Sequence, residues 1–381
     1  MDALDCDVAI VGAGPAGSSA ALSVLAAAPG LRVVLADASG FPRDKTCGDG
    51  IAPQVVDQLA TLGAHDVVEG WRPVRTFDVR HRGASVRREL RRAMWVVPRE
   101  IFDARLVEHA TAAGARLVRH RVRRVETDAR TVVLDGRLSA RVVIGCDGAN
   151  STIRTALGHA PEGRRALAVR GYAPLPASQR GVQRIVFSGR RQPSYAWCFD
   201  RGDGLANVGY GELLERAGKP PSRALFLERL EDLLPGFLET GADWRGHHLP
   251  LSSWRWSHPG GRLLLAGDAA GLVNPVTGEG IYYAVRTGML AGAAAAAALA
   301  AGEPAGAGER YARSVRANLA GHFRHVALAA RLFAQPALMT TGVRAAARDQ
   351  RVFDDFMEIA LAQGRLSGAV LRGVARAGLA G

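Results

Sequence analysis

The sequence has few of the features that identify secreted or membrane-spanning proteins. Its four cysteines lie far apart without a C-x-x-C pair, so we expect reduced thiols rather than a disulfide framework. The first residues contain no basic segment followed by an apolar one, and we expect no signal peptide. The longest alanine-rich run, residues 290–301, is too short and too weakly apolar to span a bilayer. These absences predict a cytoplasmic protein.

Lysine is also scarce, because Lys45 and Lys219 are the only lysines among 49 basic residues. Arginine therefore provides nearly all of the formal net charge of +13. A positive balance of this size is found in proteins that bind nucleic acid, anionic lipid or acidic substrates. Here the arginines are scattered singly or in pairs, which is typical of a GC-rich genome that encodes arginine in place of lysine. We predict no nucleic-acid partner, and a peripheral contact with the inner face of a membrane stays open, as does the oligomeric state.

Metal ligands are not clustered in the sequence. The pairs His247-His248 and His322 with His325 have no cysteine or carboxylate cluster beside them. Such histidines are more often surface or packing residues than zinc ligands. We predict that the protein holds no metal.

The first twenty residues contain the most informative motif. An apolar run, residues 8–11, is followed by Gly12, Gly14 and Gly17 in the spacing G-x-G-x-x-G. These glycines allow a tight turn, the approach of a pyrophosphate and the packing of a helix on a strand. A helix over residues 16–28 would direct its free N–H groups at the phosphates.

The context of this motif supports a dinucleotide site. A second apolar strand, residues 32–36, ends at Asp37. This carboxylate lies about twenty residues after the last glycine, where the motif requires a partner for a ribose hydroxyl. The spacing therefore predicts a dinucleotide-binding βαβ unit.

Further along the chain, apolar runs and turn signals predict several more elements. Helices are expected at residues 53–62, 100–113, 222–234 and 280–301, and a strand pair at 116–125 and 131–134. Residues 74–97 alternate, and strand-like stretches at 166–173, 183–188, 195–199 and 205–212 predict a separate antiparallel sheet. Two further strands are predicted to belong to the first domain. One ends in Gly145 and the other covers residues 262–266.

Two later motifs specify which dinucleotide is bound. They are residues 146–154, Cys-Asp-Gly-Ala-Asn-Ser-Thr-Ile-Arg, and residues 267–281, which begin Gly-Asp-Ala-Ala-Gly and end Gly-Glu-Gly-Ile. With the first motif, they resemble the FAD-dependent oxidoreductases built like the flavin aromatic hydroxylases, over roughly residues 5–300. Within that superfamily the chain looks most like the geranylgeranyl reductase family, through residues 42–48 (Pro-Arg-Asp-Lys-Thr-Cys-Gly), 195–199 (Tyr-Ala-Trp-Cys-Phe) and 207–211 (Asn-Val-Gly-Tyr-Gly).

The resemblance implies an α/β fold with a Rossmann-like FAD-binding domain in a three-layer ββα arrangement. An antiparallel-sheet substrate domain, itself α+β, and a helical C-terminal tail would complete it. The expected boundaries are 1–74, 98–160 and 258–302 for the FAD-binding domain, 75–97 and 161–257 for the substrate domain, and 303–381 for the C-terminal region.

The glycine motif and the resemblance together place a set of residues at the FAD. In this assignment Asp268 accepts a hydrogen bond from the ribityl chain, the loop before Ile281 faces the flavin N1–C2=O edge, and Arg154 is only a surface residue. The cofactor-binding set is Gly12, Ala13, Gly14, Pro15, Ala16, Gly17, Asp37, Ala38, Arg43, Cys47, Gly48, Arg99, Val122, Asp147, Gly148, Gly267, Asp268, Pro275, Gly278, Glu279, Gly280 and Ile281. Since no second G-x-G-x-x-G unit exists, NAD(P)H or another electron donor would visit transiently.

Cys47 is the candidate for chemistry on the substrate. A thiol flanked by Arg43 and Lys45 would have a lowered pKa and donate a proton. The alternative is a small residue that packs under the flavin ring.

Three aromatic side chains, Tyr195, Trp197 and Phe199, alternate on one predicted strand and would share a face. We expect them to wall an apolar substrate cavity, although sheet core is the alternative. The family usually continues with Phe-Pro and a basic residue, whereas this chain has Phe199-Asp200-Arg201, so its tunnel is expected to differ.

The predicted function is an FAD-dependent oxidoreductase that reduces C=C bonds of a polyprenyl or other apolar substrate by hydride transfer from reduced flavin. One alternative is a monooxygenase or halogenase of an aromatic natural product, although the G-W-x-W-x-I-P stretch of tryptophan-type halogenases is absent. A second alternative is a prenyl carrier with a flavoprotein fold and no redox chemistry. That alternative predicts a degraded nucleotide motif, whereas all three motifs are intact.

Overall fold

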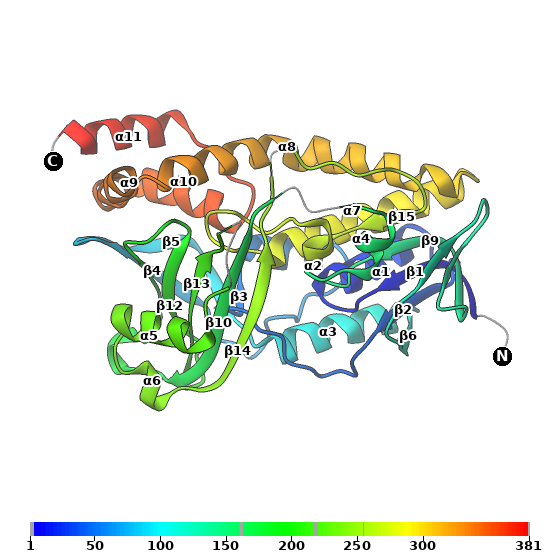
Figure 1. The fold of residues 1–381 in the computed structure, drawn as a ribbon, viewed down its shortest axis with the longest axis horizontal. Helices are drawn as coiled ribbons and strands as arrows, with labels where there is room; N and C mark the ends of the chain where they lie inside the picture. Colours follow the sequence, from blue (N-terminus) through cyan, green and yellow to red (C-terminus); the bar gives the residue numbers. More distant parts are fainter. Residues whose placement is uncertain (1–3, 160–162, 216–219, 254, 380–381) are drawn as a thin grey trace.

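The chain folds around two β-sheets that lie next to each other along the long axis of the molecule (Figure 1). The computed structural model describes residues 4–159, 163–215, 220–253 and 255–379. Both sheets are assembled from segments that are far apart in the sequence.

The first sheet contains the glycine motif. Its strand order is β6-β2-β1-β9-β8-β7, and β15 also pairs with β9. The strands are β1 (Leu4–Val11), β2 (Val33–Asp37), β6 (Arg116–Arg119), β7 (Val125–Thr127), β8 (Val132–Leu134), β9 (Leu138–Gly145) and β15 (Leu263–Leu265). Strands β6, β2, β1, β9 and β15 run parallel to one another, whereas β8 pairs with β9 in the antiparallel direction. The carboxyl ends of β1, β2, β9 and β15 therefore meet at one edge, where such sheets bind ligands.

The second sheet has the order β14-β10-β13-β12-β11-β4-β5-β3. Its strands are β3 (Gly50–Ile51), β4 (Val74–His81), β5 (Ala84–Val96), β10 (Arg165–Pro174), β11 (Val182–Phe187), β12 (Ser194–Asp200), β13 (Leu205–Leu213) and β14 (Ala242–Pro250). The pairs are antiparallel apart from β4 with β11, which run parallel. A parallel pair requires a long connection between its strands, and about a hundred residues separate β4 from β11.

The helices are distributed around both sheets. They are α1 (Pro15–Ala27), α2 (Pro53–Ala60), α3 (Arg99–Ala112), α4 (Thr152–Ala156), α5 (Arg223–Leu233), α6 (Phe237–Thr240), α7 (Ile281–Ala300), α8 (Ala307–Phe333), α9 (Pro336–Arg348), α10 (Gln350–Leu361) and α11 (Gly368–Leu379). Three short 3-10 helices complete the described chain: Ala177–Gln179, Gly267–Ala270 and Pro304–Gly306.

Helices α1 and α7 pack so closely that the backbone of one contacts the backbone of the other. A Cβ atom on Gly288 would lie 2.2 Å from the carbonyl oxygen of Ala16, and one on Gly292 would lie 2.4 Å from that of Ala20. The hydroxyl of Ser23 also donates a hydrogen bond of 2.8 Å to the carbonyl of Met289. Small residues on both helices therefore hold the start of α1 rigidly beside the start of α7.

The C-terminal helices form a layer along one side of the molecule. Figure 1 shows α8 running from the region of β15 toward the second sheet, where α9, α10 and α11 follow. Val343, Ala346 and Phe353 belong to one buried cluster with Phe77 and Ile185 of the second sheet. The C-terminal region is thus part of the wall of the second sheet.

One helix, α7, is long and apolar enough by composition to cross a membrane, with a mean hydropathy of 1.3 over its most apolar window. The prediction from residues 290–301 missed this because the helix begins earlier, at Ile281, and has 20 residues. In the structure 61% of that window is buried inside the protein, which is the environment of a core helix.

Two predicted elements are corrected. The expected strand pair at 116–125 and 131–134 is wrong, because β6 pairs with β2 and the hairpin partner of β8 is β7. Strand β14 was not predicted, although it forms an edge of the second sheet.

Candidate active site

A continuous cavity of about 700 Å³ extends from the carboxyl edge of the first sheet to the face of the second. We call its two parts the nucleotide half and the apolar half. The nucleotide half is lined by residues 11, 12, 14–16, 36–39, 43–48, 99, 120–122, 146–150, 152, 268 and 278–281. The apolar half is lined by side chains of the second sheet and the C-terminal helices: Phe77, Val79, Val86, Met94, Ile185, Phe187, Tyr195, Trp197, Phe333, Met339, Val343, Phe353, Phe356 and Met357.

The nucleotide half begins at the glycine turn between β1 and α1. Gly12 has a φ of +99°, and a Cβ atom there would lie 2.4 Å from the carbonyl oxygen of Cys146. A Cβ atom on Gly17 would lie 1.8 Å from the carbonyl oxygen of Gly12. No larger residue fits this turn, and the start of α1 is therefore left bare toward the cavity, as a phosphate site requires.

Asp37 ends β2 and lies beside this turn, with 8% of its surface exposed. Its carboxylate accepts hydrogen bonds of 2.8 Å from the backbone N–H groups of Ala13 and Ser39. These two bonds fix the carboxylate at the cavity wall. Each oxygen retains a second lone pair, which a ribose hydroxyl can use.

Two arginines are fixed at the cavity wall by one buried carboxylate. Arg99, at the start of α3, forms two hydrogen bonds of 2.6 and 2.7 Å with Asp103. Arg43 forms an ion pair of 3.2 Å with the same carboxylate. Asp103 has no local motif, so its role was not predicted. The arrangement presents two guanidinium groups to the glycine turn, since a Cβ atom on Gly14 would lie 3.5 Å from Arg43 and 3.8 Å from Arg99.

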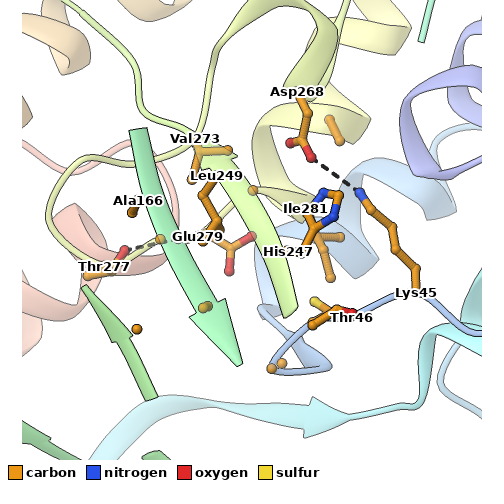
Figure 2. A pocket seen from close by; sticks show the side chains of 18 of the residues that line it. Lys45, Thr46, Ala166, His247, Leu249, Asp268, Val273, Thr277, Glu279 and Ile281 are labelled. Carbon is orange, nitrogen blue, oxygen red and sulfur yellow. Dashed lines mark hydrogen bonds and ion pairs between the residues drawn. The ribbon is translucent and has the colours of Figure 1, made fainter. Parts of the chain in front are cut away.

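Lys45 and Asp268 form an ion pair of 3.2 Å across the cavity (Figure 2). Burial would raise the pKa of Asp268, but Lys45, His247 and Arg99 outweigh it and lower that pKa. Asp268 is therefore ionised, and both of its oxygens can accept hydrogen bonds from a sugar hydroxyl. Figure 2 shows the imidazole of His247 close to Lys45.

The loop that carries Cys47 is held by side chains of the second sheet. Arg170, which has no exposed surface, donates hydrogen bonds of 2.6 Å to Asp44, 3.2 Å to the carbonyl of Lys45 and 3.3 Å to the carbonyl of Cys47. Asn207 donates to the same Cys47 carbonyl at 2.9 Å. This network joins the two halves of the cavity.

Asp49 closes the same loop. It accepts hydrogen bonds of 2.7 Å from the Tyr172 hydroxyl and from the Asn207 amide, and its φ of +58° lies in the left-handed region. Burial raises the pKa of Asp49 to about 6, although Arg170, Tyr172 and Asn207 oppose the rise. A buried acid with a left-handed backbone costs free energy, and such residues persist only where the surrounding structure holds them in place.

Cys47 lines the cavity, but its expected acidity is wrong. Burial raises the pKa of the Cys47 thiol, and the charge of Arg99 only partly offsets this. Sequence neighbours Arg43 and Lys45 do not lower the pKa because both are paired with carboxylates elsewhere. The thiol is consequently protonated at neutral pH.

The loop before α7 is tied to the C-terminal region. The Asn274 amide donates 2.9 Å to the carbonyl of Ile359, and the Thr277 hydroxyl donates 2.8 Å to the carbonyl of Ala360. Tyr283 on α7 donates 2.9 Å to the carbonyl of Ala362 and contacts His322 at 2.6 Å. The end of α10 therefore supports the loop that the sequence assigned to the flavin edge.

Glu279 projects from this loop into the cavity (Figure 2). One of its carboxylate oxygens, Oε1, accepts a hydrogen bond of 2.9 Å from the backbone N–H of Tyr282. Burial raises the pKa of Glu279 to about 7, against the hydrogen bonds from the Tyr282 and Ile281 amides. The backbone N–H groups at the start of α7 can therefore bind either this carboxylate or a ligand.

Tyr195, Trp197 and Phe199 share the cavity face of β12. Adjacent rings lie 6.0 and 6.4 Å apart between centroids, and the Trp197 indole donates 2.8 Å to Asn207. The Tyr195 hydroxyl donates to the carbonyl of Thr277. These contacts place the aromatic row beside both the Cys47 loop and the loop before α7.

Most of the residues that the sequence assigned to the site are brought together by the fold. All of them line the cavity except Ala13, Gly17, Gly267 and Pro275, which support the turns from behind.

The contribution of the C-terminal helices was missed, because their distance from the motifs in sequence hides it. The apolar spacing of Val352, Phe353, Phe356, Met357 and Ile359 was a signal for a helix with one buried face.

One single-residue expectation is corrected. Arg154 is not a surface residue, because it is 9% exposed and donates 2.6 Å to the carbonyl of Ala149 and 3.0 Å to that of Ala269. Of the histidines expected to be surface or packing residues, His247 lines the cavity. His322 packs against Tyr283, and within the described ranges no cluster of three metal-ligating side chains occurs.

The nucleotide half fits FAD by its own chemistry. It offers bare amides at the start of α1, guanidinium groups for a pyrophosphate, and the carboxylates of Asp37 and Asp268 for sugar hydroxyls. The adjoining apolar half gives an aromatic-walled space next to it.

Comparison with known proteins agrees with this fit. The profile of the FAD-binding domain family matches residues 5–209. The sequence is similar to menaquinone reductase of Mycolicibacterium smegmatis, with 34% identity over 325 residues and 75% of each chain covered. It is also similar to geranylgeranyl diphosphate reductase of Rhodobacter capsulatus, with 33% identity over 315 residues, covering 78% of this chain and 77% of the relative.

A solved structure shares the fold across nearly the whole chain. It is a geranylgeranyl bacteriochlorophyll reductase-like protein from Thermoplasma acidophilum, with a TM-score of 0.81 and 20% identity, covering 98% of this chain and 96% of the other. The match includes the C-terminal helices, which lie outside the family profile.

Proposed function

The chain belongs to the family of flavoproteins with an FAD-binding domain and is an FAD-dependent oxidoreductase, and from this premise we propose that it reduces carbon–carbon double bonds in a polyprenyl or related apolar substrate. The observation that carries the proposal is the continuity of the cavity, in which a nucleotide half opens directly into an apolar half. Relatives named for menaquinone and for geranylgeranyl diphosphate support the substrate class, because both compounds contain isoprenoid chains.

In this proposal the two halves of the cavity bind different molecules. Residues of the glycine turn, Asp37, Arg43, Arg99 and Asp268 hold the FAD, which when bound supplies hydride to a double bond. The aromatic row of β12 and the apolar faces of α9 and α10 hold the isoprenoid chain and exclude water. Exclusion of water protects a reduced cofactor from side reactions.

The apolar half accounts for the substrate class on physical grounds. Its lining is made of aliphatic, aromatic and methionine side chains from β4, β5, β11, β12 and the C-terminal helices. Burying each CH₂ group of a ligand in such a space contributes about 0.8 kcal/mol. A chain of isoprene units therefore gains more here than a polar metabolite of equal size.

The proposal also includes the source of the electrons. We assign NAD(P)H or a small electron carrier as a transient reductant, because the described chain has one glycine-rich dinucleotide turn and FAD uses it. We also place the protein in the cytoplasm with a peripheral contact at the inner membrane face, where an isoprenoid lipid would be available.

Anaerobic reduction followed by mass spectrometry tests this function. The FAD-loaded protein is reduced with dithionite and mixed with geranylgeranyl diphosphate, or with menaquinone whose quinone ring is reoxidised before the mass is measured. The expected result is a product two hydrogen masses heavier per double bond reduced. Recovery of unchanged substrates, together with oxygen incorporation when air is admitted, would contradict the proposal and favour a monooxygenase.

A further inference from the structure

We propose that Glu279 donates the proton that completes the reduction of the double bond, and this inference rests on the function proposed above. Addition of hydride to one alkene carbon leaves the other carbon to be protonated. The donor must reach the cavity, must be protonated at neutral pH and must be able to release its proton.

The position of Glu279 meets the first requirement. Its side chain points into the cavity from the loop before α7 (Figure 2). Leu249 and Val273 of the cavity lining are drawn on one side of it in Figure 2, and the Lys45–Asp268 ion pair on the other. The carboxyl group therefore lies where the two halves of the cavity meet.

Glu279 also caps α7, but capping alone does not explain it. The hydrogen bond from the Tyr282 amide needs an acceptor, and a glutamine carbonyl or a serine hydroxyl would provide one. An ionisable acid held in an apolar cavity costs free energy, which an uncharged cap would avoid. The capping role therefore does not explain why this residue is an acid.

The other candidate donors in the cavity are less suitable. Burial raises the pKa of both the Cys47 thiol and the Tyr195 hydroxyl, so each is protonated but holds its proton tightly. Burial lowers the pKa of His247 to about 4, so this imidazole is neutral and is not an acid at pH 7. Glu279, with a pKa of about 7, matches the working pH of a general acid.

The charges that face Glu279 come from several elements. Arg99 on α3 lowers its pKa and Asp268 raises it, while Cys47 and Tyr195 respond to its charge in turn. Lys45 is paired with Asp268 and His247 is neutral. The balance leaves burial as the dominant cause of the raised pKa.

The step is balanced as follows. The double bond receives hydride, with both electrons, from the reduced cofactor at one carbon. The O–H bond of the Glu279 carboxyl breaks, and a C–H bond forms at the neighbouring carbon. The carboxylate that remains takes a proton from solvent before the next turnover.

The test compares Glu279→Gln with Glu126→Gln, an exposed glutamate on β7 outside the cavity, in the FAD-loaded protein. Glu279→Gln keeps an acceptor for the Tyr282 amide and removes only the proton. We expect its single-turnover rate with reduced enzyme to fall roughly 10²- to 10⁴-fold, while its FAD content and its affinity for menaquinone stay within about threefold of the wild type. Glu126→Gln should retain the wild-type rate and the wild-type pH profile, which falls as the pH rises through about 7.

A second readout does not depend on activity. Since the pKa of Glu279 is raised on folding, the stability it contributes is complete below the ordinary carboxyl pKa and is lost as the pH rises through about 7. Urea unfolding should therefore show the wild type losing stability relative to Glu279→Gln over that range. Glu126→Gln, an exposed site on β7, is the matched control and should show no such divergence.

Three outcomes decide the matter. A Glu279→Gln rate within tenfold of an active wild type would overturn the proposal, as would a pH profile abolished by Cys47→Ala instead. A wild type that reduces no double bond would overturn the proposed function and this inference together. If Glu279→Gln does not fold, Glu279→Asp supplies the test, because a shorter acid should recover part of the rate with a shifted pH profile.

Discussion

In the nucleotide half of the cavity, charged side chains are held by other charged side chains, whereas the apolar half is walled by aliphatic and aromatic groups from distant segments. Arg43 and Arg99 share Asp103, and Lys45 pairs with Asp268. In the apolar half Phe353 of α10 packs in one cluster with Phe77 and Trp197 of the second sheet. The two halves therefore depend on different kinds of interaction.

The two kinds of interaction have different consequences for a ligand: paired charges orient it, and apolar contacts contribute affinity. Paired charges and close backbone contacts tolerate little displacement, so the nucleotide half fixes the orientation of a cofactor. Apolar contacts are non-directional, so in the proposed function the apolar half would select a substrate by its apolar surface and length. Substitutions in one half should consequently leave the function of the other half measurable.

The largest effect is expected from Gly17→Val in the nucleotide half. The new Cβ atom would lie 1.8 Å from the carbonyl oxygen of Gly12, so the turn must open. We expect a loss of more than about 4 kcal/mol in the free energy of unfolding and purified protein without flavin absorbance. Gly40→Ala is the control, because no atom lies within 4 Å of the added Cβ, and flavin content equal to wild type in Gly17→Val would contradict the rigid turn.

Phe353→Ala should produce the next largest effect, and in the apolar half only. Phe353 is 1% exposed, and removing a buried phenyl ring costs about 3–5 kcal/mol. The variant should unfold at lower urea concentration yet bind FAD stoichiometrically while folded. Leu371→Ala on α11, where the side chain is 56% exposed, should change stability by less than about 0.5 kcal/mol. Loss of FAD from folded Phe353→Ala would show that the halves are not separable.

Arg170→Met tests the link between the halves. The change removes hydrogen bonds to Asp44 and to the carbonyls of Lys45 and Cys47, at an expected cost of about 2–4 kcal/mol. Arg245→Met is the matched control, because Arg245 reaches the same Asp44 at 3.3 Å but is 55% exposed, and such pairs contribute about 0–1 kcal/mol. Urea unfolding of both variants measures the difference, and equal losses would argue against the buried link.

Asp49→Asn gives the smallest and most pH-dependent effect. Folding raises the pKa of Asp49 from 3.8 to about 6, so its contribution to stability is complete below pH 3.8 and is lost as the pH rises through about 6. Asparagine keeps an oxygen acceptor and tolerates the left-handed backbone. The stability of Asp49→Asn relative to wild type should rise by about 2–3 kcal/mol between pH 4 and pH 7.5. Urea titrations at the two values measure it, and a constant difference would show that Asp49 does not titrate on folding.

Much of the nucleotide half could be predicted from the sequence because its residues belong to contiguous motifs. Gly12, Gly14 and Asp268 each follow a strand by one to three residues, and Asp37 is the last residue of β2. The partner that fixes Arg43 and Arg99 could not be predicted, because Asp103 lies on a helix surface like many others. The raised pKa of Cys47 was missed for a related reason, since neighbours in sequence do not report burial.

The apolar half was predictable only in its central aromatic row. Tyr195 and Trp197 alternate on one strand, so their shared face follows from strand geometry. The remaining wall joins residues more than two hundred positions apart, such as Phe77 and Phe353. Such contacts have no signature in a single sequence.

By itself, the sequence determined the family, the cofactor and the strand ends that hold it, because tight turns and phosphate sites require particular residues at short fixed spacings. Only the tertiary structure decided that the end of α10 supports the loop before α7, that Arg170 joins the halves and that Glu279 is buried in the cavity wall. These features depend on burial and on contacts between distant segments, and both arise only when the chain is packed.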